Sequence, residues 1–303
     1  MTDDRAARSL ASIEAGGLPL AAQERLDKLR EGGSRFFTSD LSTNEFLLVA
    51  EAGFRPITQV MGSSVYHVGW QQTPWASTWS FPSGGATELE MLTDAWNEAR
   101  RLAVGRLREE AVRAGADAVV GVRLERGSYD WASELMEFTS YGTAVRSTRF
   151  DLGGDPVISS LSGQDFAKLF QRGWWPAGLV AATSVTYVVG DYASQLAQQG
   201  FLARTAQGGS FFSQNQELPA YTRGVYEARE YAMRRLQRQA HEAEAHGVVG
   251  VELELDVSER EVDQGGSRRD LVVTVHAIGT AVVELARAPE SPTYYAVSLK
   301  EQT

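Results

Sequence analysis

The sequence predicts an α+β protein built from two tandem copies of one small unit, and two observations lead to this prediction. First, a series of residues recurs along the chain at an offset of 120 positions, which grows to 129 and then to 137. Second, the hydrophobic periodicity changes in the same order in both halves: short helix, strand, long helix, strand, strand. Length changes confined to a few connections are expected of a duplicated domain, because loops tolerate insertions best. The recurring residues include Leu41 and Leu161, Phe46 and Phe166, Pro56 and Pro176, Glu98-Ala99-Arg100 and Glu227-Ala228-Arg229, and Gly142-Thr143-Ala144-Val145 and Gly279-Thr280-Ala281-Val282.

Each unit is predicted to begin with a short helix that leads into a strand. A serine followed three residues later by an acidic residue begins the helix as a capping box, and a glycine ends it. A mostly apolar segment follows directly and fits a strand. The capping serines are Ser42 and Ser162, the glycines are Gly53 and Gly173, and the strands are predicted over 55–68 and 175–189.

The rest of each unit is predicted to be one long helix packed on a three-stranded, mainly antiparallel sheet. Apolar stripes with helical spacing cover 88–114 and 225–240, and alternating residues around 120–124 and 249–253 predict strands. The last strand, Leu271 to Val282, is apolar on both faces, so its second face is expected to meet another domain or subunit. Three strands also leave two open sheet edges, and pairing between units would close them.

These elements divide the chain into four predicted segments. Residues 1–35 form an N-terminal helical segment, 36–150 the first copy, 151–288 the second copy, and 289–303 a C-terminal tail. Short helices are marginal alone, so the N-terminal helices must dock. Docking on their own domain is favoured over capture of a partner.

Composition excludes several classes of function. The net charge of −10 and the pI near 5.0 argue against nucleic-acid binding, which needs a positive surface. The absence of cysteine removes disulfides, thiol nucleophiles and thiolate metal sites. The first residues show no signal-peptide pattern, so we expect a cytoplasmic protein.

One segment of 17 residues without charge, Trp174 to Gly190, raises the question of a membrane span. It is short for a span and contains Pro176 and Thr183. Its counterpart in the first copy contains Arg55 and His67. Because one fold must serve both copies, we predict buried strands and no membrane span.

Three motifs in order resemble the YbjQ-like putative heavy-metal-binding domain family. They are Ala114-Gly115-Ala116-Asp117-Ala118-Val119-Val120-Gly121-Val122, the preceding Glu98-Ala99-Arg100, and the later Gly142-Thr143-Ala144-Val145. The resemblance covers roughly 54–146 and 174–284, and the second copy departs from it over residues 243–250. It implies a small dodecin-like βαββ fold and a ring, most simply a pentamer. Five chains would then supply ten units, as two stacked rings with one ring built from each copy.

The family description implies a metal site, but the ligand spacing does not support one. His241 and His246 are five residues apart and so lie on different faces of a helix. His67 and His276 come from different copies and are not counterparts. Soft metals prefer thiolates, and the chain has none. We therefore predict no cofactor, with a metal ion as an alternative that the spacing leaves unsupported.

Arg100 and its counterpart Arg229 lie just off the apolar stripe of the long helices. Two roles are open for them. Either residue could clamp an anion or an interface through forked hydrogen bonds, or it could form a structural salt bridge to a neighbouring strand or subunit. The structural salt bridge is favoured.

The connections before the two long helices are rich in large aromatic residues, which interfaces concentrate. Long connections of this kind are usually functional. They could dock subunits, capture a protein partner or fold over their own domain. The candidate interface residues are Trp70, Trp75, Trp79, Phe81, Phe211 and Phe212.

No catalytic motif is present, so the sequence predicts a protein that is not an enzyme. The predicted function is a cytoplasmic, ring-forming homo-oligomer that binds a partner or a small ligand at the surfaces between units. The alternative is a protein that binds a metal ion or a small anion. A third alternative is an enzyme with a carboxylate site in a pocket between units.

Overall fold

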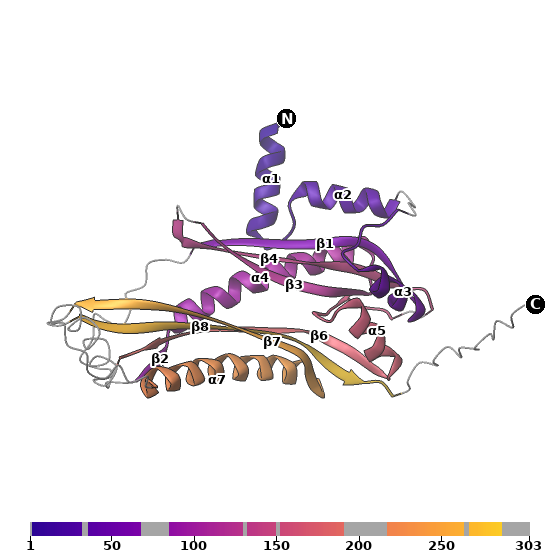
Figure 1. Cartoon of the computed structure of the whole chain (residues 1–303). Coiled ribbons are helices and arrows are strands. Elements are labelled where there is room, and N and C mark those ends of the chain that lie inside the picture. Colours follow the sequence, from indigo (N-terminus) through magenta and orange to yellow (C-terminus); the bar gives the residue numbers. More distant parts are fainter. Residues whose placement is uncertain are drawn as a thin grey trace, which may run out of the picture.

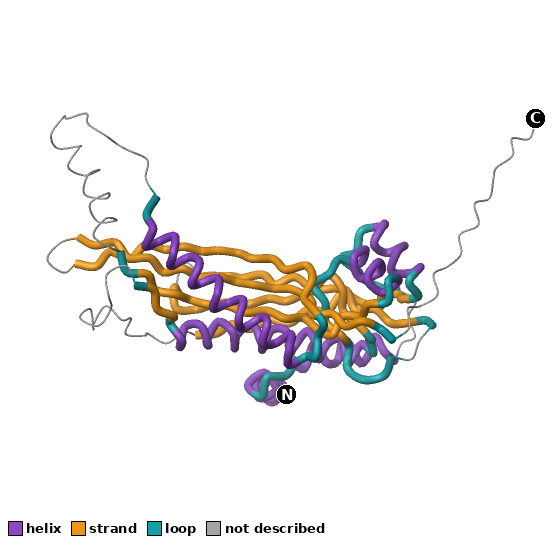
Figure 2. Tube along the Cα trace, turned by 90° about the horizontal axis from the view of Figure 1, so that it is seen from below, coloured by secondary structure: helices purple, strands orange, loops and turns teal. Residues whose placement is uncertain are grey.

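The computed structural model describes residues 2–31, 36–67, 85–129, 132–149, 152–190, 217–263 and 267–286. Two sheets lie one above the other, as Figure 1 shows, with the long helix of the first copy beside both and that of the second copy below the lower sheet. Seen from below in Figure 2, the long helices run along the length of the strands. The predicted α+β fold with two repeated units is confirmed.

The elements of the first copy follow the predicted order. Ser42 caps the first helix through a complete capping box with Glu45, as predicted. The long helix ends at Gly115, whose φ of 68° is a left-handed conformation that glycine adopts without strain. The elements are α3 (Thr43–Glu51), β1 (Phe54–His67), β2 (Ala86–Glu88), α4 (Glu90–Ala114), β3 (Ala118–Tyr129) and β4 (Ala132–Ser147).

The second copy repeats this order with longer final strands. The segment without charge is a strand, as predicted, and in the described part of the chain no helix is long and apolar enough to cross a membrane. The elements are β5 (Val157–Ile158), α5 (Gly163–Gln171), β6 (Trp174–Val188), α7 (Pro219–Glu242), β7 (Gly247–Asp263) and β8 (Ser267–Glu284).

Each sheet has four strands, whereas the sequence predicted three. The first sheet has the order β1-β4-β3-β5 and the second the order β2-β6-β8-β7. The fourth strand always comes from the other copy, because β5 joins the sheet of the first copy and β2 joins the sheet of the second. Strands of two or three residues carry too little periodicity to be recognised in a sequence. The predicted closure of sheet edges between units is therefore present inside one chain.

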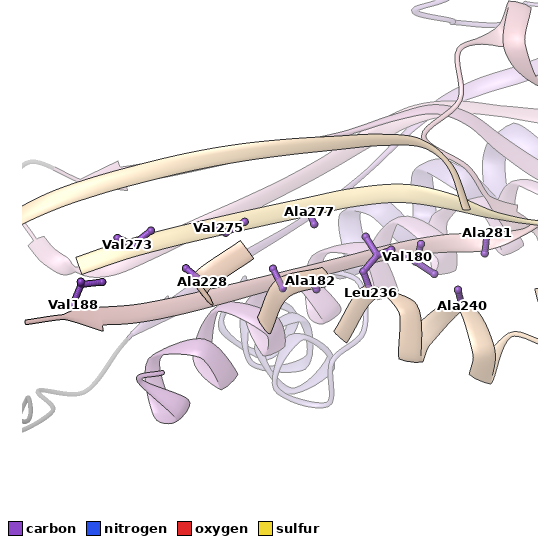
Figure 3. Close-up of a cluster of buried hydrophobic side chains, with 11 residues drawn as sticks. Val180, Ala182, Val188, Ala228, Leu236, Ala240, Val273, Val275, Ala277 and Ala281 are labelled. Carbon is purple, nitrogen blue, oxygen red and sulfur yellow. The ribbon is translucent and has the colours of Figure 1, made fainter. Parts of the chain in front are cut away.

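The helix α7 covers one face of the second sheet, and Figure 3 shows their side chains meeting. Leu236 and the alanines of α7 pack on valines and alanines of β6 and β8, all of them buried. The opposite face of β8 meets the first copy: Val272 packs with Trp96 of α4, and the Trp96 ring lies 5.1 Å from the His276 ring. Both faces of the last strand are thus covered, as the sequence predicted.

The helix α4 lies very close to β1. A Cβ added at Gly62 would stand 2.1 Å from the Ala103 carbonyl oxygen and 2.5 Å from the Leu107 nitrogen. Both atoms belong to the backbone of α4, which cannot move away locally without breaking helical hydrogen bonds. Glycine at position 62 therefore sets the distance between α4 and its own sheet.

Two N-terminal helices, α1 (Thr2–Glu14) and α2 (Leu20–Glu31), dock on the first copy, as predicted. Leu18 and Leu26 are buried in a small cluster with Ala114 at the end of α4. The described side chains of α1 are mostly exposed. The attachment therefore depends on a few contacts near the turn between the two helices and along α2.

We predict that Gly62→Ala destabilises the protein by roughly 1–3 kcal/mol, because the added methyl group overlaps the α4 backbone. Urea unfolding followed by circular dichroism measures this loss. Gly105→Ala on the exposed side of α4 is the matched control, since a Cβ there meets nothing within 4 Å. It should gain roughly 0.5–1 kcal/mol from helix propensity. Equal midpoints for the Gly62 variant and the native chain would contradict the close packing.

Candidate functional site: the interface between the two copies

The two copies are joined by an exchange of edge strands. Val157 and Ile158 pair in parallel with β3 of the first copy, where the Val157 nitrogen donates to the Asp117 carbonyl at 3.1 Å. The chain continues along β3, and the Ser159 nitrogen donates to the Val119 carbonyl at 2.9 Å. The edge of β3 is therefore covered by a segment of the second copy.

In return, the first copy covers the edge of β6. The strand β2 pairs antiparallel with the end of β6, and the Leu89 nitrogen donates to the Val185 carbonyl at 2.7 Å. Glu88 accepts two hydrogen bonds from Arg235 of α7, at 2.5 and 3.0 Å. The side chains of Arg235 and Glu88 are only 20% and 12% exposed, so this ion pair is more shielded from water than a surface pair.

An apolar cluster fills the space between the exchanged segments. Phe54 of the first copy is 1% exposed and packs edge-on against Phe166 and Phe170 of the second copy, with ring centroids 5.2 and 5.3 Å apart. Trp175 completes this aromatic group, 6.1 Å from Phe54. Aromatic pairs at these distances add to the free energy gained from burial alone. The cluster belongs to both copies, so neither copy has this core without the other.

Arg100 reaches from α4 across to β6. Its guanidinium donates to the Thr183 hydroxyl at 2.8 Å and to the Ala181 carbonyl at 2.7 Å, and it also bonds Asn97. Burial lowers the pKa of Arg100 to about 10, so it stays charged at neutral pH. These three partners are neutral oxygens, so the salt bridge that the sequence favoured for Arg100 is replaced by neutral acceptors, and Glu98 pairs with Arg101 beside it on the helix. In this position Arg100 clamps the interface between the copies.

Arg229 lies on the exposed side of α7. Its position on α7 matches that of Arg100 on α4, yet no strand of the described chain faces it in the way that β6 faces Arg100. The same residue type at the same position of the repeat is therefore buried in one copy and exposed in the other.

His276 continues the polar contacts of Arg100 into the interface. Its Nδ1 lies 2.9 Å from the Thr183 hydroxyl, which already accepts a hydrogen bond from Arg100. If that hydroxyl donates to Nδ1, the proton of the neutral ring is on Nε2. Burial, and then the positive charge of Arg126, lower the pKa of His276 to about 3. His276 is therefore a neutral member of the interface at physiological pH.

The interface also contains a cavity of about 640 Å³ between the two sheets that is partly open to solvent. Arg126 of β3 spans it and pairs with Glu254 and Asp256 of β7. Charged groups of both signs face the space. Its lining includes Glu45, Arg100, Arg123, Tyr141, Glu252 and His276.

Several predicted interface residues cannot be placed. Trp70, Trp75, Trp79, Phe81, Phe211 and Phe212 lie outside the described residues, so their role stays a prediction. The sequence reasoning missed the exchange segments around Val157 and Ala86. One signal could have found the first of them: Ser159 and Leu161 repeat Ser39 and Leu41 ahead of the capped helices.

A metal site would need several ligating side chains close together. Within the described ranges, no group of three or more histidine, aspartate and glutamate side chains could hold a metal ion. The chain has no cysteine anywhere. The described residues therefore do not fit the metal that the family description names.

The fold and its interface define a class of protein: a tandem α+β repeat whose copies complete each other's sheets. A family model with the description "Putative heavy-metal-binding" and the name YbjQ_1 matches residues 56–148 and 212–284. The chain belongs to this YbjQ-like family and carries two tandem copies of its domain, as the sequence motifs predicted.

Similar proteins include one of comparable length. An encapsulin nanocompartment protein of Mycobacterium tuberculosis is 39% identical over 244 residues, which cover 79% of this chain and 84% of that relative. UPF0145 proteins of Enterococcus faecalis and Vibrio campbellii are 39% and 43% identical over 59 and 60 residues. Those stretches cover 20% of this chain and 54% and 55% of the two relatives. The family description and these names mention metal binding and a nanocompartment, and no reaction.

We predict that His276 makes the stability of the fold depend on pH. The pKa of His276 is about 3 in the folded chain and about 6.5 in the unfolded chain. At pH values between these two, the unfolded chain binds a proton that the folded chain does not. Stability therefore falls as the pH drops below about 6.5, by up to about 1.4 kcal/mol per pH unit from this group. The free energy of unfolding, measured with urea at pH 7, 6 and 5, should show this fall.

The variant His276→Asn should lose this part of the pH dependence, because asparagine does not titrate. The exposed His241 on α7 provides the control, and His241→Asn should keep the native slope. An unchanged slope for His276→Asn would contradict a neutral, buried His276.

Proposed function

We propose that the chain is a non-enzymatic assembly protein that joins copies of itself head to tail. The contact between its two copies carries this proposal, because the strands exchanged there are not equivalent: the first copy gives β2 and the second gives β5. A contact of this kind is heterologous. Repeated between molecules, it either closes a ring or continues as a filament.

The second copy keeps the acceptor edge that this contact needs. β7 is the outer strand of its sheet in the described part of the chain. Val251 of β7 is 39% exposed, whereas Val122, its counterpart in β3, is 2% exposed beside Ile158. Leu253 and Leu255 are also about half exposed, at 45% and 49%. An open edge with apolar side chains favours pairing with another chain.

The first copy keeps the matching donor segment. Residues 37–39 precede the capped helix as residues 157–159 do in the second copy. The Ser39 hydroxyl and the Asp40 nitrogen lie 3.4 and 3.2 Å from the Thr143 hydroxyl, and Ser159 and Ser160 contact Thr280 in the same way. The segment is thus already held in the position from which it could pair with β7 of another molecule.

The relative from Mycobacterium tuberculosis supports an assembly role, because it is named as a nanocompartment protein. We propose that the chains close into a ring. The five-unit rings implied by the family resemblance suggest five as the number of chains. The heterologous contact supports alternation of the two copies around one ring, which requires an even number of units. Five chains in one ring of ten units meet this condition, and two stacked rings are the alternative arrangement. The cytoplasm remains the proposed location.

Binding at the surfaces between units is the second part of the proposal. The cavity of about 640 Å³ is the place where a small ligand would bind, and the aromatic connections would recognise a protein partner. The alternative of metal binding gains no support from the described residues, which offer no ligand cluster.

We predict that the full chain forms species whose masses are whole multiples of 33.1 kDa in native mass spectrometry. Ser39→Pro should lower the mean mass at least several-fold toward the monomer, because proline removes the N–H that would pair with β7 of the next molecule. Ser39→Ala keeps this N–H and should assemble as the native chain does. Electron microscopy of side views would separate one ring from two stacked rings.

A monomeric native chain at all concentrations would contradict head-to-tail assembly. Equal masses for Ser39→Pro and Ser39→Ala would contradict the donor role of residues 37–39, provided both variants show native circular dichroism.

A further inference from the structure

We infer that a second copy of this chain docks its α7 on the edge of β1 and displaces the N-terminal helices, which now cover part of that edge. The inference rests on the proposed head-to-tail assembly. It assigns an occupant to an interaction surface and a role to α1 and α2.

The edge of β6 shows how a helix from the neighbouring copy binds. Thr93 of α4 accepts a hydrogen bond from the Val185 nitrogen at 2.9 Å. Asn97 binds both the nitrogen and the carbonyl of Thr183, at 3.0 and 2.9 Å. With Arg100, these side chains serve backbone groups along the edge of a strand. The helix therefore replaces a neighbouring strand as the hydrogen-bonding partner of β6.

The edge of β1 lacks this cover over much of its length. Met61 and Val65 are 52% and 53% exposed, while their counterparts Ala181 and Val185 are 7% and 2% exposed. Strands with the same core pattern thus differ in exposure because, among the described elements, β6 has a helix of the other copy against it and β1 does not. Two large apolar side chains left half exposed on an edge strand mark an incomplete interface.

The helix α7 keeps two of the three side chain types, threonine and arginine, and has a tyrosine where α4 has Asn97. Thr222, Tyr226 and Arg229 stand at the positions of Thr93, Asn97 and Arg100. Tyr226 is 67% exposed and Arg229 is exposed. Docked on β1 of a second copy, Arg229 would reach the Met61 carbonyl and the Ser63 hydroxyl as Arg100 reaches Ala181 and Thr183.

Part of the β1 edge is occupied by the chain's own N-terminal helices. In the second copy, Arg235 binds the carboxylate of Glu88, which belongs to the first copy. Its counterpart Arg106 instead donates to the carbonyls of Gly17 and Ile13, at 3.1 and 3.0 Å. The turn between α1 and α2 therefore binds the arginine that would bind Glu217 of a second copy, since Glu217 is the counterpart of Glu88.

A second residue of α4 also binds the N-terminal helices. Gln239 of α7 binds the nitrogen and carbonyl of Ala181, both at about 3 Å. Its counterpart Glu110 accepts from the Met61 nitrogen at 2.9 Å and from Arg25 of α2 at 2.7 Å. Arg25 is 52% exposed whereas Glu110 is 5% exposed, so this ion pair is the main polar contact that α2 makes with α4 and the one to disrupt in a test of displacement.

The two occupants exclude each other because both need Arg106. The turn of α1 and α2 offers two neutral backbone carbonyls to its guanidinium, while a second copy offers a carboxylate, which adds the attraction of opposite charges and can accept two parallel hydrogen bonds. Few side chains of α1 and α2 are buried, so opening this segment exposes little apolar surface. A second copy can therefore displace it.

The test locks α2 in place. Leu26 and Ala114 pack together in one buried cluster, and the chain has no cysteine to interfere with a disulfide between them. In the variant Leu26→Cys/Ala114→Cys, oxidation should shift native mass toward the 33.1 kDa monomer, and reduction should restore the native distribution. Arg25→Glu, which places like charge beside Glu110, should loosen α2 and raise the mean mass at equal concentration.

The outcomes separate this inference from the proposed assembly. If Leu26→Cys/Ala114→Cys, oxidised or reduced, and Arg25→Glu all give the same distribution of masses, displacement of α1 and α2 is overturned and head-to-tail assembly still stands. If these proteins and the native chain are all monomeric, both the displacement and the head-to-tail assembly are overturned.

A cross-link tests the occupant directly. Ser63→Cys/Tyr226→Cys places thiols at the counterparts of Thr183 and Asn97, which bind each other inside the chain. Oxidation should give a ladder of covalent multiples on a non-reducing gel. The control Ser63→Cys/Arg234→Cys moves one thiol to the counterpart of the exposed Gly105 and should give no ladder. Two results would overturn docking of α7 on β1. One is a ladder of equal strength in both variants, and the other is no ladder in either variant while the native chain assembles.

Discussion

The exchange of edge strands between the copies is the constraint on which the rest of the structure depends. Each copy alone would leave a three-stranded sheet with two open edges, and an open edge is a site of uncontrolled association. Here β5 covers β3 and β2 covers β6. Each copy therefore completes the sheet of the other, and the two fold as one body around a shared aromatic cluster of Phe54 and Phe166.

The same constraint explains why equivalent residues differ so strongly in their surroundings. Arg100 is 6% exposed and binds β6, while Arg229 at the same position of the repeat is exposed. The difference arises from place in the chain and not from a change of residue type, because among the described residues the first copy has a neighbour on its helix side and the second has none. An arginine retained where the described chain offers it no strand is the physical basis for assigning it an external one.

Most of the fold could be predicted from the sequence because its signals are local. The capping box at Ser42 and the helical stripe of α4 each act within a few residues, and both appear as predicted. The exchange strands could not be predicted, since β5 has two residues and its partner lies in the other copy. The burial of Arg100 depends on contacts with the other copy, so the sequence could offer an interface clamp as one of two roles but could not choose it over a salt bridge.

Duplication also allows two interfaces of one design to differ in chemistry. The cavity inside the chain contains Arg126 of β3 and His276 of β8. In the proposed contact between molecules their counterparts are Leu255 and Thr139, so the space there would lack this arginine and this imidazole. A ring of identical single units would repeat one cavity around its circumference. Alternating copies give two kinds of cavity, and only the inner kind contains the Arg100–Thr183–His276 series of hydrogen bonds. Selective binding can therefore evolve in one cavity while the other keeps only the packing that holds the molecules together.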